Sequence, residues 1–361
     1  MNTQELSNNT VTQLYETGLS LLKQLIATPS FSKSEDKTAT IIEDFFKSNG
    51  IPTQRSMNNV WAYNKHYDTL KPTILLNSHH DTVKPNSGYT LNPFEPIEKD
   101  GKLFGLGSND AGGPLVSLIC AFLYFYEKQN LKYNLIITAT AEEEISGVNG
   151  VESIYKKLGP IDFAIVGEPT EMNLAIAEKG LLVLDCEASG TSSHAAHPNM
   201  DNAILNAIQD IHWFTQYKFD KISPILGEVK MTPTIINSGS QHNVVPNTCH
   251  FTVDVRTNEC YSNEEVYQLI QEKVKSNVTA RSLRLNSSSI PLEHPYVKAG
   301  LALGRTYYGS PTSSDQAVIL CPSLKIGPGL STRSHSSDEF IYLNEIKDAI
   351  QIHISILTQI L

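Results

Sequence analysis

The chain has 361 residues and a formal net charge of −10, with 40% hydrophobic and 18% charged residues. The acidic balance argues against nucleic acid or an anionic membrane surface as a partner. The length exceeds what one compact core usually holds, so we expect two domains. The five cysteines have no CxxC spacing, so neither a disulfide framework nor a zinc knuckle is predicted.

The first motif with chemical content is an apolar run that ends in histidines. Met1–Glu5, at the start of the chain, lacks the basic and apolar regions of a signal peptide, so we expect a cytoplasmic protein. Ile74–Val83 then reads as a buried strand that runs into His79 and Asp81. A histidine that binds a metal usually needs a carboxylate on its second nitrogen, and Asp81 can fill that place for His79.

Two further segments place carboxylates at the ends of predicted elements. Asp110 lies in a glycine-rich turn just before an apolar helix, Leu115–Tyr126, and a carboxylate at a helix start can bridge two ions. Leu135–Thr140 is a second buried strand, and Glu142–Glu144 follow it almost directly. Adjacent carboxylates repel each other unless a cation lies among them, and one of them can then stay free as a base.

A third strand, within Ala164–Thr170, carries Glu168, and His335 lies in the loop before the last helix. Each of these residues taken singly reads as a solvated loop residue. Ligands of open α/β sheets, however, gather at the carboxyl ends of strands. Two imidazoles and three carboxylates form a set suited to a pair of zinc-like divalent ions. The candidate metal ligands are His79, Asp110, Glu144, Glu168 and His335.

The pattern of elements changes near residue 180, which predicts an inserted domain. The expected strands and helices from there on are Leu181–Ala188, Asn202–Thr215, Thr232–Ile236, His250–Val255, Asn263–Lys275 and Thr279–Leu285. Their β-α-β-β-α-β order predicts a ferredoxin-like α+β unit over residues 180–289. Residues 1–179 and 290–361 would form the catalytic, metal-binding domain, an α/β fold with a mixed, mainly parallel sheet flanked by helices. That domain would end with a strand in Val318–Ile326 and a helix, Asn344–Leu361.

Nearly the whole chain resembles the di-zinc aminoacylase and carboxypeptidase-G-like metallohydrolases, which include acetylornithine deacetylase and succinyl-diaminopimelate desuccinylase. The resemblance implies that His79, Asp110 and Glu168 hold one metal. It implies that Asp110, Glu144 and His335 hold the other, with Asp110 as the bridge. The metals would be zinc, or cobalt in its place. The inserted domain would serve as a lid and as a homodimer surface.

The resemblance also implies catalytic roles. Matching Thr140–Glu144 to the family's Thr-Ala-Asp-Glu-Glu makes Glu143 the general base, although the run of three glutamates permits a slip to Glu144. Asp81 would orient His79. His194, in a Gly-Thr-Ser-Ser-His motif, would stabilise the oxyanion. The positions that match substrate contacts are Asn243, Arg256 and Thr312.

Some alternatives remain open at this point. His80 stands where the family has a smaller residue, so either histidine of the pair could be the ligand. The family's lysine after the bridging aspartate is missing, because this chain has Ala111–Gly113 there. His194 could be a surface histidine in a polar turn. Arg256 could form a salt bridge instead of binding a substrate carboxylate.

The expected reaction is hydrolysis of the amide bond of an N-acyl amino acid. Lys325–Phe340 looks most like the acetylornithine-type deacetylases, which points to N-acetylornithine, acetylcitrulline or succinylornithine and to arginine biosynthesis. A succinyl carboxylate would need one more donor, which Arg333 or Thr312 could supply. The alternatives are a succinyl-diaminopimelate desuccinylase, an acetyl-lysine deacetylase or a dipeptidase of the same family. A binding protein that has lost catalysis would lack the intact set of ligands and Glu143.

Overall fold

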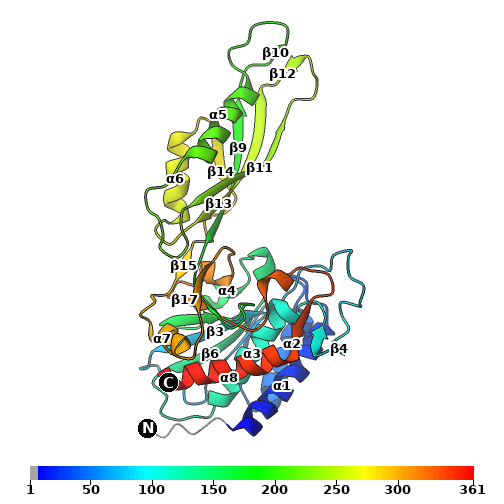
Figure 1. Ribbon diagram of the computed structural model, residues 1–361, viewed down its shortest axis with the longest axis vertical. Helices are drawn as coiled ribbons and strands as arrows, with labels where there is room; N and C mark the ends of the chain where they lie inside the picture. Colours follow the sequence, from blue (N-terminus) through cyan, green and yellow to red (C-terminus); the bar gives the residue numbers. More distant parts are fainter. Residues whose placement is uncertain (1–6) are drawn as a thin grey trace. The chain divides into compact units, whose positions relative to one another are not determined.

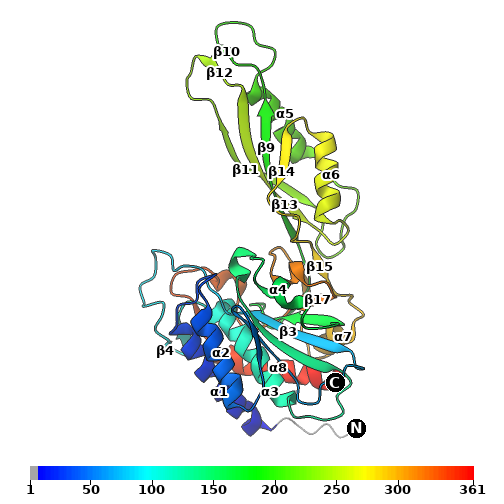
Figure 2. The same ribbon diagram turned by 180° about the vertical axis from the view of Figure 1, so that it is seen from behind.

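The computed structural model describes residues 7–361, so Met1–Glu5, on which the signal-peptide expectation rests, lie outside it. The described chain forms two compact units (Figures 1 and 2). Unit 1 comprises the described residues up to Ile176, Ile290–Tyr308 and Ser314–Leu361, and unit 2 comprises Ala177–Ser289 and Gly309–Ser313. The expected roles of the two parts, catalysis and lid or dimer surface, stay predictions.

A mixed sheet forms the centre of unit 1, with strands in the order β1-β2-β6-β3-β7-β17-β8. β3, β6, β7 and β17 run parallel to their neighbours in this group, whereas β1, β2 and β8 pair antiparallel. The bounds are β1 (Gln54–Ser56), β2 (Asn59–Tyr63), β3 (Thr73–His79), β6 (Asn134–Thr140), β7 (Phe163–Val166), β8 (Leu174–Glu178) and β17 (Ser323–Lys325). The short strands β15 (Ser288–Ser289) and β16 (Tyr307–Ser310) pair with β8.

Every residue of β3, β6 and β7 is buried, as expected for parallel strands that are covered on both faces. α3 packs against β3 and β6, and α1 and α8 pack against α3 (Figures 1 and 2). The helices of unit 1 are α1 (Asn8–Ile26), α2 (Asp36–Ser48), α3 (Gly113–Phe125), α4 (Val151–Tyr155), α7 (Pro295–Ala302) and α8 (Leu343–Ile360). None of the helices in the described part of the chain is long and apolar enough to span a membrane.

The predicted end of the first buried strand is wrong. The first buried strand was expected to continue to Val83, but β3 ends at His79. Beyond it the backbone leaves the sheet, because the Thr82 N–H donates to the Ser30 carbonyl at 2.9 Å. His79 is therefore the last residue of its strand. A second, small sheet in unit 1 has the order β18-β5-β4, with β4 (Ile97–Lys99), β5 (Lys102–Phe104) and β18 (Phe340–Tyr342).

Unit 2 has the predicted β-α-β-β-α-β order, and its antiparallel sheet has the order β11-β13-β9-β14. This is the arrangement of a ferredoxin-like unit. The elements are β9 (Gly180–Ser189), α5 (Ala203–Gln216), β11 (Lys230–Ser238), β13 (Thr248–Thr257), α6 (Asn263–Lys273) and β14 (Asn277–Ala280). α5 and α6 lie on one side of this sheet (Figure 1). The last strand ends five residues before the predicted Leu285, since Arg281 is already beyond β14.

The core of unit 2 is a cluster of aliphatic and aromatic side chains between this sheet and its helices, including Leu184, Phe214 and Val253. Both helices begin at a capping side chain. Asn202 accepts a hydrogen bond from the backbone at the start of α5, and Ser262 forms a capping box at the start of α6. Beyond the sheet, β10 (Ser193–His194) and β12 (Val244–Val245) form a separate two-stranded ladder.

One histidine in the core of unit 1 gives the stability of the fold a dependence on pH. His353 lies on the buried face of α8, fully shielded from solvent, and neither ring nitrogen has a hydrogen-bond partner among the described residues. Burial lowers its pKa to about 3 from the ordinary 6.5. The imidazole is then neutral in the folded state between these values, whereas the unfolded chain takes up a proton. Stability from this residue is fully present above pH 6.5 and is lost as pH falls toward 3.

We therefore expect His353→Leu to flatten the loss of stability on acidification. Between pH 7 and pH 5 the free energy of unfolding should fall by about 2 kcal/mol less in the variant than in the original protein. Urea unfolding of metal-free samples at the two pH values measures this difference, with the exposed His212→Leu as a control for the loss of one histidine. An equal loss in the original and in His353→Leu would mean that the folded protein protonates His353.

Candidate metal centre

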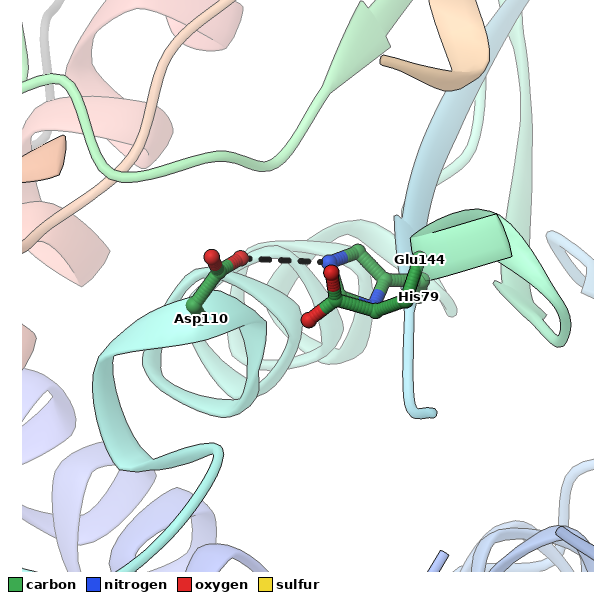
Figure 3. A group of neighbouring side chains, drawn as sticks. All are labelled: His79, Asp110 and Glu144. Atoms are coloured by element: carbon green, nitrogen blue, oxygen red, sulfur yellow. Dashed lines mark hydrogen bonds and ion pairs between the residues drawn. The ribbon is translucent and has the colours of Figure 1, made fainter. Parts of the chain in front are cut away.

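The carboxyl ends of three parallel strands carry most of the candidate ligands. His79 is the last residue of β3, Glu143 and Glu144 form a 3₁₀ turn after β6, and Glu168 follows β7. β3 pairs in parallel with both β6 and β7, so these strand ends lie at one edge of the sheet. Asp110 comes from the short turn that precedes α3. Figure 3 shows His79, Asp110 and Glu144 converging from these three elements.

The Nε2 atom of His79 faces three carboxylates. It lies 3.3 Å from Asp110 Oδ1, the contact that Figure 3 marks with a dashed line. It also lies 3.9 Å from both Glu143 Oε2 and Glu168 Oε1. The His79 side chain is 1% exposed, so this nitrogen has little access to bulk water. A ring nitrogen that gives up its proton, surrounded by carboxylate oxygens, is a donor set that a divalent cation can use.

Asp110 lies between the two histidines of the candidate site. Its Oδ1 faces His79, and its Oδ2 lies 3.7 Å from Nε2 of His335. The same His335 nitrogen is 2.9 Å from Glu144 Oε2. Each oxygen of Asp110 thus belongs to a different group of ligands, which is the arrangement that a bridging carboxylate needs.

The spacing of these atoms fits zinc-like ions. Four ligands at about 2.1 Å from a tetrahedral ion lie roughly 3.4 Å from one another. Two overlapping groups have ligand atoms within 4.8 Å of one another: His79, Asp110 and Glu144, and His79, Glu143 and Glu168. Both groups share Nε2 of His79, so they fit one ion, and Asp110, Glu144 and His335 provide donors for a second. Both glutamates after β6 lie within reach of His79, so distance alone does not assign the base.

The structure distinguishes the two adjacent histidines. Both ring nitrogens of His80 are occupied away from the carboxylates: Nδ1 lies 2.9 Å from Thr38 Oγ1, and Nε2 lies 2.9 Å from the Asn58 carbonyl. Burial lowers the pKa of His80 to about 4, so it is neutral near pH 7. Only His79 faces the carboxylates.

Asp81 holds His79 and the turn after β6 together. The His79 Nδ1–H donates to the Asp81 carbonyl at 3.0 Å, and the Asp81 carboxylate lies 3.4 Å from the same nitrogen. This leaves Nε2 directed at Asp110 and the other carboxylates. The carboxylate accepts hydrogen bonds from the N–H groups of Glu143 and Glu144, at 3.1 and 3.2 Å, and from the Ser32 hydroxyl at 2.7 Å. Asp81 therefore contacts His79 through its carbonyl as well as its carboxylate.

Negative charge is concentrated in this part of the molecule. Burial, with the charges of Glu168, Asp315 and Glu144, raises the pKa of Glu143 well above its usual range, although His79 opposes the rise. Burial and the Asp110 charge raise the pKa of Glu168 to about 8. Several carboxyl groups at one place, some of them partly protonated, form a site that attracts cations.

The histidines respond to the same field. Burial by itself lowers the pKa of His79, but Glu143, Asp110 and Asp81 together hold it well above the usual range. The hydrogen bond to Glu144 raises the pKa of His335 to about 9. Imidazolium groups thus balance part of the carboxylate charge, a role that metal cations would take over.

Two buried carboxyl groups that support the site were missed by the sequence reasoning. Asp315 accepts hydrogen bonds from Asn77 and Thr140, both at 2.7 Å, below the strand ends. Glu339, 1% exposed, accepts the N–H groups of Asn109 and Asp110 at 2.8 and 3.0 Å. Both acids lie in segments that read as polar turns, and no local pattern distinguishes a buried acid there from a solvated one.

The site residues expected in the inserted part lie in unit 2. His194, on β10, pairs with Val244 of β12, and the Asn243 carbonyl accepts the Ala195 N–H at 3.0 Å. His194 and Asn243 are therefore neighbours, and both are exposed. Because they are neighbours in one ladder, both could contact the same substrate.

The other two predicted substrate contacts lie elsewhere in unit 2. Arg256, on β13, forms a two-pronged ion pair with Asp254, at 2.8 and 3.0 Å. This is the salt bridge that the sequence left open as the alternative to substrate binding. Its binding of a substrate carboxylate stays a prediction. The exposed Thr312 lies with its hydroxyl 3.0 Å from Ser310 Oγ.

Comparison with known proteins places this site in context. The model of the family described as Peptidase family M20/M25/M40 matches residues 75–359. A succinyl-diaminopimelate desuccinylase of Rickettsia bellii is 26% identical and covers 94% of this chain and 96% of its own. An acetylornithine deacetylase of Proteus mirabilis is 28% identical, over 90% of this chain and 92% of its own.

Solved structures confirm the α/β fold with its inserted unit. The aminopeptidase PepT of Bacillus cereus superposes with a TM-score of 0.76 at 16% identity, over 96% of this chain and 98% of its own. A Bacillus subtilis protein described as a dinuclear metal binding peptidase gives a TM-score of 0.70 at 15% identity, over 96% and 99% of the two chains. At such identities the likeness concerns the fold.

Proposed function

The chain belongs to peptidase family M20/M25/M40, and from this premise we propose that it removes the acyl group from an N-acyl amino acid. It is an enzyme, a hydrolase like its relatives. One observation carries the proposal: Nε2 of His79 lies close to the carboxylates of Asp110 and Glu168, and the carboxyl group of Glu143 lies beside them. This is a set of metal ligands next to a candidate base.

N-acetylornithine or a close analogue, such as acetylcitrulline or succinylornithine, is our leading substrate, which would place the enzyme in arginine biosynthesis. The similarity to an acetylornithine deacetylase supports it. The similarity to a desuccinylase supports succinyl-diaminopimelate equally. Both relatives are named for removing an acyl group from a diamino acid, so that class of substrate has the stronger support.

We assign the metal ligands as two overlapping sets. His79 and Glu168 would hold one ion, Glu144 and His335 the other, and Asp110 would bridge them, with zinc as the leading metal and cobalt as a substitute. Bound there, the ions would supply Lewis acidity and would lower the pKa of a water. The two oxygens of Asp110, each facing a different histidine, support the bridge.

Glu143 is the proposed general base. It would take a proton from the attacking water and return it to the leaving amine. Its raised pKa, caused mainly by burial, suits a group that must hold a proton between these two steps. Asp81 fixes the backbone of Glu143 and the ring of His79 at once, so it positions both groups.

His194 is the proposed donor to the developing oxyanion, with Asn243 beside it as a substrate contact. The Ala196 N–H donates to Nδ1 of His194 at 3.1 Å, which leaves Nε2 to carry the hydrogen and to donate it. Arg256 would bind the substrate carboxylate, for which it would have to exchange its bond to Asp254.

The distance between these residues within unit 2 supports a homodimer. Arg256 pairs across the sheet with Leu181, near the start of β9, whereas His194 follows Ser189, the end of that strand. Eight residues of strand at about 3.3 Å each separate the two positions by roughly 26 Å. One small substrate cannot contact both from a single chain, so we propose that a partner chain supplies one of them.

The edge strand β11 offers the surface for such a partner. Ile235 and Ile236 on it are 51% and 52% exposed. The strand has β13 on one side, and its other edge has no partner strand among the described residues. An unpaired edge with exposed isoleucines can pair with a second chain. We therefore place the dimer contact on β11.

Mixing two inactive variants tests whether His194 acts across the dimer. His194→Ala should lower kcat about 10²–10³-fold with little change in KM, since an oxyanion donor acts mainly in the transition state. In a mixed dimer with Glu143→Gln, the site on the His194→Ala chain keeps its base and receives His194 from its partner. One of the two sites of each mixed dimer should therefore be active, so the purified mixed dimer should have roughly half of the original activity.

Co-expression of the two variants with different affinity tags, followed by purification of the doubly tagged dimer, provides the measurement. A matched control is the mixture of two separately tagged His194→Ala chains, which should stay inactive. No recovery in a confirmed mixed dimer would mean that His194 acts within its own chain. An unchanged kcat in His194→Ala alone would mean that His194 is a surface loop residue without a catalytic role.

The substrate proposal is tested by turnover of a matched panel. Acetyl and succinyl derivatives of ornithine, citrulline, lysine and diaminopimelate should be compared with simple dipeptides in the presence of added zinc. We expect the highest kcat/KM for an acylated diamino acid, with acetylornithine first. Faster hydrolysis of unacylated dipeptides than of every acylated amino acid would contradict the deacylase assignment, while leaving the metal chemistry in place.

A further inference from the structure

Unit 1 contains a cleft, lined by charged and apolar side chains, that does not include the candidate metal ligands. Its volume is about 410 Å³, within the range of roughly 300–1,000 Å³ that small-molecule sites occupy. One face of α8 forms a wall, and the segments after β7 and α7 form the others. Its lining includes Glu171, Met172, Leu303, Arg305, Asp348 and Ile352.

Arg305 is the residue of this cleft that calls for a ligand. Its backbone is fixed, because its N–H donates to the Gly300 carbonyl at 3.1 Å and the next residue, Thr306, donates to Asn173 at 3.2 Å. The Nε atom is buried, and it has no hydrogen-bond partner among the described residues. A buried donor without an acceptor is unfavourable, and a carboxylate can accept two parallel hydrogen bonds from a guanidinium.

The charges around Arg305 define what else the ligand would carry. Glu345 also lines the cleft, but Arg333 binds it through two hydrogen bonds of 2.7 and 3.1 Å. Glu171 and Asp348, both exposed, add two further carboxylates. One guanidinium and two carboxylates complement a molecule with one carboxylate and two ammonium groups.

The remaining lining is apolar. Met172 is 4% exposed and Leu303 is 38% exposed, and Ile352 lies between exposed and buried on α8. Methylene groups that link charged ends can pack on such a surface while the charges meet their partners.

We propose that this cleft binds a free basic α-amino acid of the lysine or ornithine class. The carboxylate pairs with Arg305, the two ammonium groups lie near Glu171 and Asp348, and the methylene chain packs on the apolar wall. This is a site beyond the proposed reaction, and it does not depend on the identity of the substrate.

The position of the cleft connects it with the metal centre. Glu171, three residues after Glu168, donates its N–H to the Gly329 carbonyl at 2.8 Å, and Met172 donates to the Gly327 carbonyl at 2.9 Å. The segment that contains Gly327 and Gly329 follows β17 and continues to His335. An occupant therefore lies against the segments that carry two candidate metal ligands, a suitable place for a free amino acid to act on the enzyme.

Isothermal titration calorimetry of the full chain tests the proposal. Lysine and ornithine are titrated in excess chelator, so that heat from the metal centre does not contribute. We expect one equivalent to bind in the original protein and affinity to fall about ten-fold or more in Arg305→Met. Lysine amide, which lacks the carboxylate, and norleucine, which lacks the side-chain ammonium group, should bind about ten-fold more weakly than lysine.

Lys298→Met is the matched control, because Lys298 is an exposed cation of α7 that pairs with Glu293 and does not line the cleft. It should bind lysine like the original protein. If Arg305→Met fails to fold, Asp348→Asn on the exposed face of α8 replaces it, with the same expected loss. Absence of heat at millimolar lysine and ornithine, equal affinity in the Arg305 or Asp348 variant, or equal binding of norleucine would overturn the proposal.

Discussion

Replacing Glu143 with glutamine should lower kcat by about 10²–10⁴-fold while the metal content stays close to that of the original protein. Glutamine keeps the shape of the side chain but cannot take up the proton of the attacking water. Glu143 Oε2 lies 3.9 Å from His79 Nε2, a distance at which it can be a base beside a bound ion or a ligand of it. The expected result would identify Glu143 as the general base.

Glu144→Gln is the matched variant, because the two residues are neighbours in the same 3₁₀ turn. Glu144 Oε2 lies 2.9 Å from His335, so its loss should weaken one metal site and lower the metal content. Steady-state kinetics and elemental analysis of both purified variants decide between the roles. If Glu143→Gln loses metal while Glu144→Gln keeps it, the assignment of base and ligand within Glu142–Glu144 is wrong by one residue.

Chelation should abolish activity, and addition of zinc or cobalt should restore it. The ligand atoms around His79 and His335 include several carboxylate oxygens, a donor set that divalent cations can use. We expect up to two divalent ions per chain in active protein. His335→Ala should remove one of them, because His335 lies beside Glu144 of its own set and the bridging Asp110.

Elemental analysis before and after dialysis against a chelator, with activity measured on the same samples, provides the test. An exposed histidine outside the site, His66→Ala, is a control for the loss of one imidazole. Full activity in protein from which elemental analysis finds no divalent ion would contradict the metal centre as a whole. Retention of both ions in His335→Ala would contradict only its place among the ligands.

Much of the fold could be predicted from the sequence because its strands are strongly marked. Largely apolar, β-branched runs such as Leu135–Thr140 are typical of buried parallel strands, and the structure places β6 there. The change of pattern near residue 180 predicted the order of elements in unit 2 for the same reason. Strand ends were less certain, as the early end of β3 at His79 shows, because the exit from the sheet depends on a contact with distant Ser30.

The sequence by itself determined which candidate ligands end up together. His79, Glu143, Glu144 and Glu168 are each tied to the end of a parallel strand, and parallel strands bring such ends to one edge of the sheet. The strand ends can be read from the local sequence, and any parallel sheet brings them to the same edge. This prediction needs no knowledge of side-chain packing.

Only the tertiary structure decided which neighbouring residue faces the site and which acids are buried behind it. His80 is directed away by Thr38 and Asn58, which lie in other elements, and Asp315 is held by hydrogen bonds from two different strands. Arg256 is paired with Asp254 by the alternation of side chains along β13. The outcomes for His80 and Asp315 depend on hydrogen bonds between residues distant in sequence, about which local patterns carry no information.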